Sequence, residues 1–379
     1  MSKKKKRSQR FYDYSLLFTI VFLTIFGLVM IYSASSYTAQ IHYDGNAAYY
    51  MTKQGAIALG GFAIMIMVSK MDYHWYARFS NLAIVVSWGL MIAVSLFGRK
   101  INGKRRWLGV GALSFQPTEL VKITVIVAMA ALITRIGKDV DRTAGITRAA
   151  LITLPLAAIV AHNNLSSGII IAGIGFVMMF VASKKMLLYA LCVIGAGAVL
   201  VGAGPIGNAL TTMKILKPYQ LTRINVWLDP EAYPTTGGYQ VLQGLYAIGS
   251  GGLFGKGLGE SIQKLGFVPE AQNDMIFSII CEELGLFGAV LVIFLFVFMI
   301  YRFMLIASNA PDLFGSLLVV GVMAHIAIQV VLNIAVVTNS IPNTGITLPF
   351  ISYGGTSILF LMIEMGMVLS VSNQIKLEK

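Results

Sequence analysis

Four carboxylates gather around the start of a long apolar stretch of the chain. They lie in the segment FVPEAQNDMIFSIICEELG and are Glu270, Asp274, Glu282 and Glu283. The apolar stretch that follows carries no charge up to Ile300. A charged side chain at the centre of a bilayer costs about 3 kcal/mol or more on insertion scales. Acids at the mouth of a membrane helix therefore indicate a site that faces water and substrate.

The composition predicts an all-α, polytopic membrane protein. Of the 379 residues, 57% are hydrophobic and 12% are charged, and the mean hydropathy is +0.77. A soluble domain could not bury this much apolar surface. Stretches long enough to cross roughly 30 Å of hydrocarbon predict about ten transmembrane helices, near residues 13–35, 51–69, 80–98, 117–136, 146–162, 168–183, 186–205, 276–303, 313–338 and 353–372.

The positions of the basic residues predict how the chain is oriented. The start MSKKKKRSQR is basic, as are the loops after the second, fourth, sixth and eighth predicted helices. Because Lys and Arg in short loops favour the cytoplasmic side, we expect both termini to be cytoplasmic. The expected order is a basic tail (1–12), helices 1–7 (13–205), one large extracytoplasmic loop (206–275), helices 8–10 (276–372) and a second cytoplasmic tail (373–379).

The net charge of +13 does not indicate a nucleic-acid partner. Six of the positive charges lie in the first ten residues, where a basic tail attracts anionic lipid, and no basic domain interleaved with aromatics is present to stack bases. Cys192 and Cys281 both fall in predicted helices, so no disulfide framework is implied. The four scattered histidines lack the spacing of a structural zinc site.

One basic loop departs from the charge pattern. GRKINGKRRW follows the third predicted helix and puts five positive charges on the predicted extracytoplasmic side, at Arg99, Lys100, Lys104, Arg105 and Arg106. Charges kept against the insertion bias favour an anionic ligand such as phosphate, diphosphate or a lipid headgroup. A solvated loop that touches headgroups is the alternative.

A possible ion pair lies at the start of the fourth predicted helix. Pro117 suits a first helical turn, and Glu119 and Lys122 follow three residues apart, on one face. At a membrane boundary each charge protects the other from desolvation. The pair is either an electrostatic element of a site or a salt bridge that only anchors two helices.

Polar side chains recur every four residues along the ninth predicted helix, at His325, Gln329 and Asn333. Such a stripe can hydrogen-bond a neighbouring helix or line a cavity. SIPNTGITLPFISYGGTS follows (340–357), and its Pro and Gly residues break the backbone. Irregular backbone at membrane depth is tolerated only against protein or water.

A glycine-rich segment, AIGSGGLFGKGLGES, lies at 247–261. Lys256 is followed by Gly257, so no phosphate-binding loop register fits. We expect a flexible or re-entrant surface loop here rather than a nucleotide site.

Five segments together closely resemble the shape, elongation, division and sporulation (SEDS) family. They are WLGVGALSFQPTELVK, NVWLDP, GLFGKGLGES, VPEAQNDMIFSIICEELG and LPFISYGGTS, which occur in the family's order along essentially the whole chain. PEAQND and GITLPF are more similar to the FtsW and sporulation branch than to the RodA branch.

The resemblance implies ten transmembrane helices and a peptidoglycan glycosyltransferase of the bacterial cytoplasmic membrane, serving cell division at the septum. Its substrate would be lipid II, the undecaprenyl-diphosphate-linked disaccharide-pentapeptide, and its partners a class B penicillin-binding protein transpeptidase and other division proteins. The essential acid of the family maps to Asp274. This chain departs from the family at HNNLSSG (162–168), where an acidic motif is frequent, and at Gln272, where a histidine is usual.

These inferences combine into one mechanism. We expect Asp274 to act as the general base in an inverting glycosyl transfer, with nearby acids and low dielectric raising its pKa. Alternatively, Asp274 is an N-cap of the helix that follows it. The expected substrate-binding residues are Arg105, Arg106 and Lys122 on the diphosphate, with Glu119 orienting Lys122, and Gln329, Asn333 and Ser352.

A divalent cation, Mg²⁺ or Mn²⁺, could share the diphosphate, although no compact ligand motif fixes its site; no organic cofactor is implied. Two other classes of function remain open. Polar stripes and broken helices also suit a flippase for lipid II, and a scaffold for the division transpeptidase could coexist with either activity.

Overall fold

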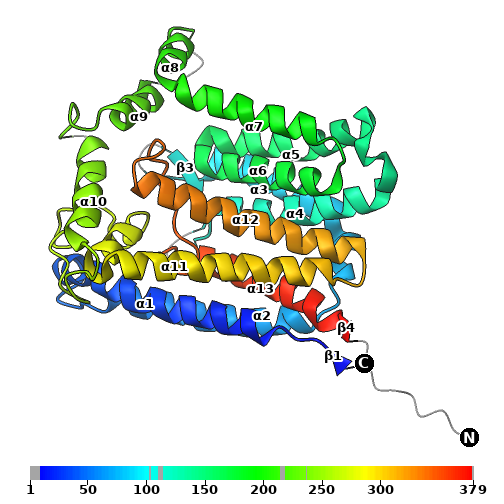
Figure 1. Cartoon of the computed structure of the whole chain (residues 1–379), viewed down its shortest axis with the longest axis horizontal. Helices are drawn as coiled ribbons and strands as arrows, with labels where there is room; N and C mark the ends of the chain where they lie inside the picture. The colour runs from blue at the N-terminus through cyan, green and yellow to red at the C-terminus, as the bar shows by residue number, and fades with distance from the viewer. Residues whose placement is uncertain (1–8, 102–103, 110–113, 214–217, 236, 378–379) are drawn as a thin grey trace, which may run out of the picture.

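The computed structural model describes residues 9–101, 104–109, 114–213, 218–235 and 237–377. Within these residues nine helices are long and apolar enough to cross a membrane (Figure 1). They are α1 (Tyr14–His42), α2 (Tyr49–Lys70), α3 (His74–Phe97), α4 (Pro117–Ile136), α5 (Thr143–Asn163), α6 (Leu165–Ala182), α11 (Ile276–Ser308), α12 (Leu313–Val337) and α13 (Ser357–Gln374).

A tenth candidate span is bent. α7 (Met186–Val201) and α8 (Ala203–Thr212) meet at Gly202 with a bend of 80°. The predicted all-α polytopic fold with about ten membrane helices is confirmed. Within the helix predicted near 186–205, α7 ends at Val201 and the chain turns at Gly202.

The first and last described segments of the chain lie together. β1 (Gln9–Arg10) pairs antiparallel with β4 (Lys376–Leu377), and both lie at the same end of the bundle (Figure 1). Asp13 caps α1 by accepting from Leu16 N at 2.9 Å and binds Arg302 of α11 at 2.7 Å. The side of the membrane on which this end lies stays a prediction.

The opposite end of the bundle carries most of the structure outside the long helices. The segment 206–275, expected to be one loop, contains part of α8 and two further short helices, α9 (Pro218–Leu228) and α10 (Gly237–Gly251). The basic loop after α3 forms a hairpin of β2 (Arg99–Ile101) and β3 (Lys104–Trp107). These segments bring the polar motifs of the chain to one end of the helices.

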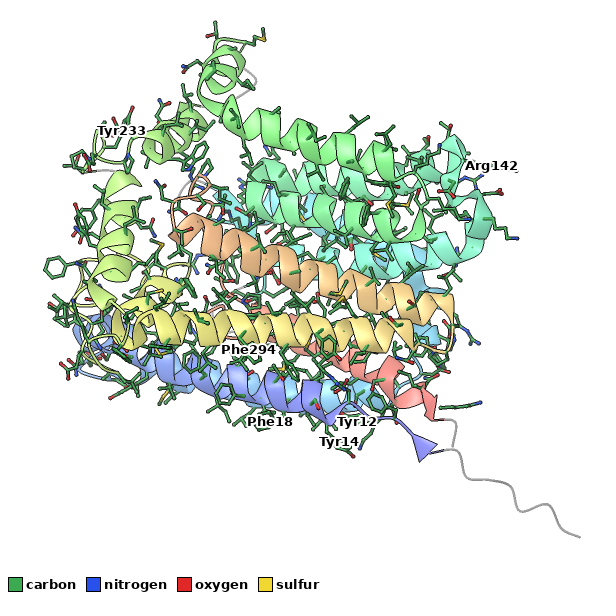
Figure 2. All side chains as sticks on the ribbon, in the orientation of Figure 1. Tyr12, Tyr14, Phe18, Arg142, Tyr233 and Phe294 are labelled. Atoms are coloured by element: carbon green, nitrogen blue, oxygen red, sulfur yellow. The ribbon has the colours of Figure 1, made fainter. Side chains whose placement is uncertain are left out.

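The core lies around α12, which packs against α4, α6, α11 and α13. The outside of the bundle is also apolar (Figure 2): Phe18 on α1 is 69% exposed and Phe294 on α11 is 61% exposed. Exposed apolar side chains all round a helix bundle suit a surface that lipid covers.

α11 is interrupted near its start. Gly285 has φ 66° and ψ −163°, which breaks the helical hydrogen-bond ladder. The freed carbonyls of Glu282 and Glu283 accept from the backbone N–H groups of Lys256 and Gly257, both at 2.9 Å. On the other side of the break, the N–H groups of 286 and 287 donate to the carbonyls of 252 and 253 at 2.9 and 3.2 Å.

The glycine-rich segment thus supplies the backbone partners that the broken helix lacks. A Cβ at Gly255 would lie 2.2 Å from the Glu283 carbonyl oxygen, and Gly255 has a φ of +78°. Only glycine fits there. Of the flexible or re-entrant loop that the sequence predicts, the flexible form does not fit, because this loop is packed on α11 by its own backbone; the re-entrant form stays a prediction.

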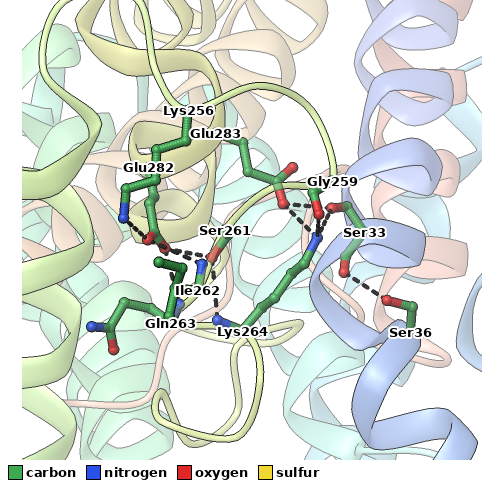
Figure 3. Close-up of polar contacts among 10 residues, drawn as sticks. All are labelled: Ser33, Ser36, Lys256, Gly259, Ser261, Ile262, Gln263, Lys264, Glu282 and Glu283. Carbon is green, nitrogen blue, oxygen red and sulfur yellow. Dashed lines mark hydrogen bonds and ion pairs between the residues drawn. The ribbon is translucent and has the colours of Figure 1, made fainter.

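Two buried carboxylates fasten the same loop (Figure 3). Glu282 is fully buried, and its carboxylate accepts from Lys256 Nζ at 2.7 Å, from the Ser261 hydroxyl, and from the backbone N–H groups of Ile262 and Gln263 at 3.2 and 3.3 Å.

Glu283 is equally buried. Its Oε1 accepts from Lys264 Nζ at 2.9 Å and from the hydroxyl of Ser33 on α1 at 2.6 Å. We call Glu282, Glu283 and their partners the glutamate anchor. The expectation that these two acids face water and substrate is wrong, because both lie in the first turns of α11 under the loop.

The glutamate anchor generates a stability prediction. Glu283→Gln leaves the Lys264 ammonium buried without its counter-ion, and breaking a buried pair in this way costs about 3 kcal/mol or more. We expect a lower thermal unfolding midpoint in detergent. Glu260→Gln removes an exposed acid of the same loop and is the matched control, with a midpoint near wild type. Equal midpoints for the two variants would contradict the role given to Glu283.

Candidate active site

A cavity of about 590 Å³ opens at the end of the bundle that carries α9 and α10. Its walls come from α2, β3, α4, α6, α9, α10, α12, the segment before α11 and the segment between α12 and α13. Seven charged side chains of the described residues line it: Lys53, Arg106, Glu119, Lys122, Arg223, Glu270 and Asp274. Four are cations and three are acids.

Asp274 lies on the turn just before α11. Its Oδ1 atom is buried and has no hydrogen-bond partner among the described residues. The N-cap residue of α11 is Met275, without a side-chain cap hydrogen bond. The alternative in which Asp274 caps α11 is therefore wrong. Its Oδ2 atom instead lies 3.6 Å from where a Cβ at Gly345 would stand.

The surroundings of Asp274 raise the pKa of its carboxyl to about 7. Burial is the largest cause and the negative charge of Glu270 is the next, while the Arg223 guanidinium opposes both. A carboxyl that titrates near neutral pH can take a proton from a substrate hydroxyl far better than an ordinary aspartate. The expected raised pKa thus has a geometric basis.

Glu119 and Lys122 form the ion pair that their spacing predicts. Lys122 Nζ lies 2.9 Å from Glu119 Oε2, and their side chains are 3% and 10% exposed, respectively. α4 starts at Pro117 after Gln116 in extended backbone, so both charges fall in the first two turns. Both line the cavity, so the pair lies in the candidate site, and its role there stays a prediction.

The basic hairpin sends its neighbouring arginines to different places. Arg106 lines the cavity, and its Nε donates to the Asn163 carbonyl at 3.0 Å. Arg105 does not line it, because its guanidinium donates to the carbonyls of Ser95 and Leu96 at the end of α3. Successive strand residues point to opposite faces, which accounts for the difference. Arg99 is exposed outside the cavity, and the side chains of Lys100 and Lys104 lie outside the described residues.

The polar stripe of α12 holds the segment between α12 and α13. Gln329 lines the cavity, donates to the Thr347 carbonyl at 3.0 Å and pairs with His325 at 2.9 Å. His325 in turn lies 2.7 Å from Glu364 of α13. The stripe both packs helices and reaches the cavity.

Two predicted binding residues lie behind the cavity wall. Asn333 is buried and donates to the carbonyls of Asp274 and Ile346 at 2.9 and 2.7 Å. The Ser352 hydroxyl accepts from Leu348 N at 2.8 Å, within a turn. Both side chains are committed to the backbone that shapes the site. Gln272 is likewise buried, and its carbonyl accepts from Tyr353 N at 2.9 Å.

Three cavity residues were missed by the sequence analysis. Lys53, in the first turns of α2, is an ionisable residue inside a predicted membrane helix, a signal that could have been used. Arg223 of α9 donates to the Asn343 carbonyl at 3.0 Å, and Tyr353 follows the broken segment. The sequence around Arg223 and Tyr353 carries no comparable signal.

The described residues do not offer a metal site made by protein alone. No group of three His, Cys, Asp or Glu side chains among them could hold an ion. Of the three cavity acids, Glu119 is paired with Lys122, which leaves Glu270 and Asp274. Such a pair suits only a cation that takes its other ligands from a bound diphosphate and water.

Comparisons with known proteins agree over nearly the whole chain. The stage V sporulation protein E of Bacillus subtilis is 38% identical over 361 residues, 94% of this chain and 95% of that protein. The probable peptidoglycan glycosyltransferase FtsW of the same organism is 37% identical over 375 residues, 98% of this chain and 93% of that protein.

Two solved structures share the fold. A structure described as "Structural coordination of polymerization and crosslinking by a peptidoglycan synthase complex" matches with a TM-score of 0.77 and 29% identity, over 96% of this chain and 98% of that one. The rod shape determining protein RodA of Thermus thermophilus matches with a TM-score of 0.68 and 24% identity, over 97% and 98%. The profile of the family described as cell cycle protein, FtsW/RodA/SpoVE, matches residues 14–377, and the chain belongs to this family.

Proposed function

We propose that this chain is a peptidoglycan glycosyltransferase that polymerises lipid II at the outer face of the bacterial cytoplasmic membrane, at the septum during cell division. The observation that carries the proposal is Asp274, which is partly exposed, has one buried carboxylate oxygen without a described hydrogen-bond partner and a pKa of about 7, and lies in a cavity lined by four cations. The relatives named as probable peptidoglycan glycosyltransferases support the reaction class.

The reaction is a direct displacement with inversion. The acceptor sugar hydroxyl attacks the anomeric carbon of the donor, the new glycosidic bond forms, and the bond from that carbon to the diphosphate oxygen breaks. The hydroxyl proton passes to Asp274, which is why its pKa matters. The diphosphate leaves with its added negative charge.

The cations of the cavity would stabilise this leaving group. Arg106 and Lys122 come from β3 and the first turns of α4, and Glu119 holds Lys122 at 2.9 Å in a fixed position. Preorganised charge in a site of low dielectric stabilises a developing anion better than mobile water does. Lys53 and Arg223 add two further positive charges to the lining. Arg105 is left out of this role by its contacts with α3.

A divalent cation remains part of the proposal in a limited form. Mg²⁺ or Mn²⁺ would supply further charge to the diphosphate, held by its oxygens and the Glu270 carboxylate. Asp274 would then stay free as the base.

The partner we propose is a class B penicillin-binding protein. A structural neighbour at 29% identity comes from a peptidoglycan synthase complex whose description couples polymerization with crosslinking. Transpeptidases form those crosslinks, so polymerisation by this chain would feed such an enzyme.

The deciding experiment gives labelled lipid II to the purified chain in liposomes, with and without that partner. Glycan polymer supports the proposal. Movement of lipid II between leaflets without polymer indicates the flippase instead, and neither activity, with partner present, indicates a scaffold.

The first functional prediction concerns Asp274. Asp274→Asn keeps the size of the side chain and cannot take a proton, so we expect polymerisation to fall by at least a hundredfold. The unfolding midpoint should be equal or higher at pH 8, because a carboxyl whose pKa is raised from 3.8 to about 7 on folding destabilises the fold progressively between these pH values and fully above 7. Asp44→Asn, at an exposed turn, is the matched control and should polymerise normally. A fully active Asp274→Asn protein would falsify the assignment of the base.

The pH profile should follow the same carboxyl. Because the ionised form is the base, kcat should rise with pH and level off above about 7. Glu270→Gln removes a charge that raises the pKa of Asp274, so the rise should move to lower pH. Arg223→Gln removes a charge that lowers this pKa, so the rise should move to higher pH. Two profiles that stay on the wild-type curve would show that another group titrates.

A double-mutant cycle separates the two roles of the Glu119 and Lys122 pair. Either Glu119→Gln or Lys122→Met alone leaves one buried charge unpaired and should lower the unfolding midpoint. The double variant should recover much of that loss and still fail to polymerise, because the cation at the diphosphate is gone. Recovery of both stability and polymerisation in the double variant would remove Lys122 from the reaction.

A further inference from the structure

Four tyrosines from separate parts of the chain pack together beside the cavity. They are Tyr43 at the end of α1, Tyr49 and Tyr50 at the start of α2, and Tyr353 before α13. Tyr43 and Tyr49 stack with ring centroids 3.6 Å apart, and Tyr50 meets Tyr43, Tyr49 and Tyr353 edge to face at 5.5, 5.4 and 5.0 Å. We call these four residues the tyrosine cluster.

The tyrosine cluster is continuous with the cavity. Tyr353 and Lys53 both line the cavity, and Lys53 Nζ lies 5.7 Å from the centroid of the Tyr49 ring. All four residues are partly exposed, so their packing is not that of a closed core. Burial raises the pKa of the Tyr353 hydroxyl, which therefore stays protonated and can donate a hydrogen bond.

A membrane-interface belt does not explain this arrangement by itself. Belt tyrosines face headgroups around a protein, whereas these four contact one another across three segments and lead to a charged cavity. Edge-to-face packing also fixes the ring orientations, so the exposed parts of the rings form a preorganised surface. Preorganised aromatic surface beside a polar cavity is typical of a ligand subsite.

A saccharide is the ligand that such a surface fits. The ring C–H bonds of a β-linked pyranose make one face apolar, and the negative face of an aromatic ring attracts these C–H groups. Phenolic hydroxyls at the ring edges can exchange hydrogen bonds with the sugar hydroxyls. The cavity, at about 590 Å³, has the size of a site for a single small ligand. A growing glycan must therefore extend past its rim.

We propose that the tyrosine cluster is a saccharide subsite that binds one or two sugars of the glycan strand outside the cavity. The proposal rests on the function proposed above, which it extends from the reacting groups to the product. Stacking on the cluster holds the strand near the cavity between successive additions.

A binding measurement with a saccharide tests the subsite independently of polymerisation. The probe is a tetramer of β-1,4-linked N-acetylglucosamine, and saturation-transfer NMR follows its binding to the full-length protein in nanodiscs. We expect the wild-type protein to bind the tetramer with a millimolar Kd. The double variant Tyr43→Ala with Tyr49→Ala should lose about tenfold in affinity. The double variant Tyr43→Phe with Tyr49→Phe keeps both rings, so its affinity should change by less than twofold. Tyr301→Ala removes an exposed ring on α11 and is the matched control.

Folding is checked by the unfolding midpoint of each variant. Should the alanine double variant fail to fold, Tyr43→Ala alone is measured, with an expected loss of about threefold. No binding by folded wild type, or equal binding by folded alanine and wild-type proteins, overturns the subsite.

Polymer analysis separates the subsite from the proposed function. With lipid II, the alanine variant should start at a rate near wild type and release strands at most half as long, as a weaker hold on the product requires. Tyrosine-dependent binding of the tetramer without any polymerisation supports the subsite and contradicts the glycosyltransferase. Polymerisation with strands of unchanged length overturns the subsite and leaves the glycosyltransferase in place.

Discussion

Two fully buried carboxylates in the first turns of α11 determine where the site can lie. An unpaired charge in this position would be too costly to bury, so Glu282 and Glu283 must be matched, and their described partners lie on α1, at the end of α10 and in the chain from there to Lys264. The ion pair with Glu283 therefore holds the loop in place at Lys264, and α11 begins at Ile276. Asp274 lies on the short segment between these two points.

On the side of α12, Asp274 is held through its backbone and not through its carboxylate. Asn333 of α12 gives both described hydrogen bonds of its amide to backbone carbonyls, one of them that of Asp274 itself. Gly345, with a φ of +70°, lies beside the carboxylate, and a Cβ there would stand in ordinary contact with Oδ2, at 3.6 Å. Donors spent on the backbone position the acid, while burial and the negative charge of Glu270 raise its pKa and no described donor binds its Oδ1. Rigidity and basicity thus come from the same arrangement.

Hydropathy predicted the helices well because each one must satisfy its own backbone in lipid. It failed where backbone partners come from elsewhere in the chain, as at Gly285 and the glycine-rich loop. The sequence grouped Asp274 with Glu282 and Glu283, but about two helical turns separate the acid before α11 from the two buried structural ones. Neither that burial nor the loop covering it can be inferred from spacing alone.

The binding residues show the same limit at the level of single side chains. Arg105 and Arg106 are adjacent residues of the same type. Only the register of the hairpin directs Arg105 toward α3 and Arg106 toward the cavity. Glu119 and Lys122 were predictable because helix geometry fixes residues three apart.

The charged residues that line the cavity come from different segments of the chain. Arg106 and Lys122 come from the β3 and α4 side, whereas Asp274 lies on the turn before α11, with Glu270 and Arg223 acting on its pKa in opposite directions. Because Glu270 raises and Arg223 lowers the pKa of Asp274, a small movement of either side chain would change this pKa. Arg223 sits on α9, whose hold on the segment between α12 and α13 includes the Trp227 indole and the Asn339 carbonyl at 3.0 Å. Any displacement of α9 would therefore move Arg223, whose positive charge lowers the pKa of Asp274.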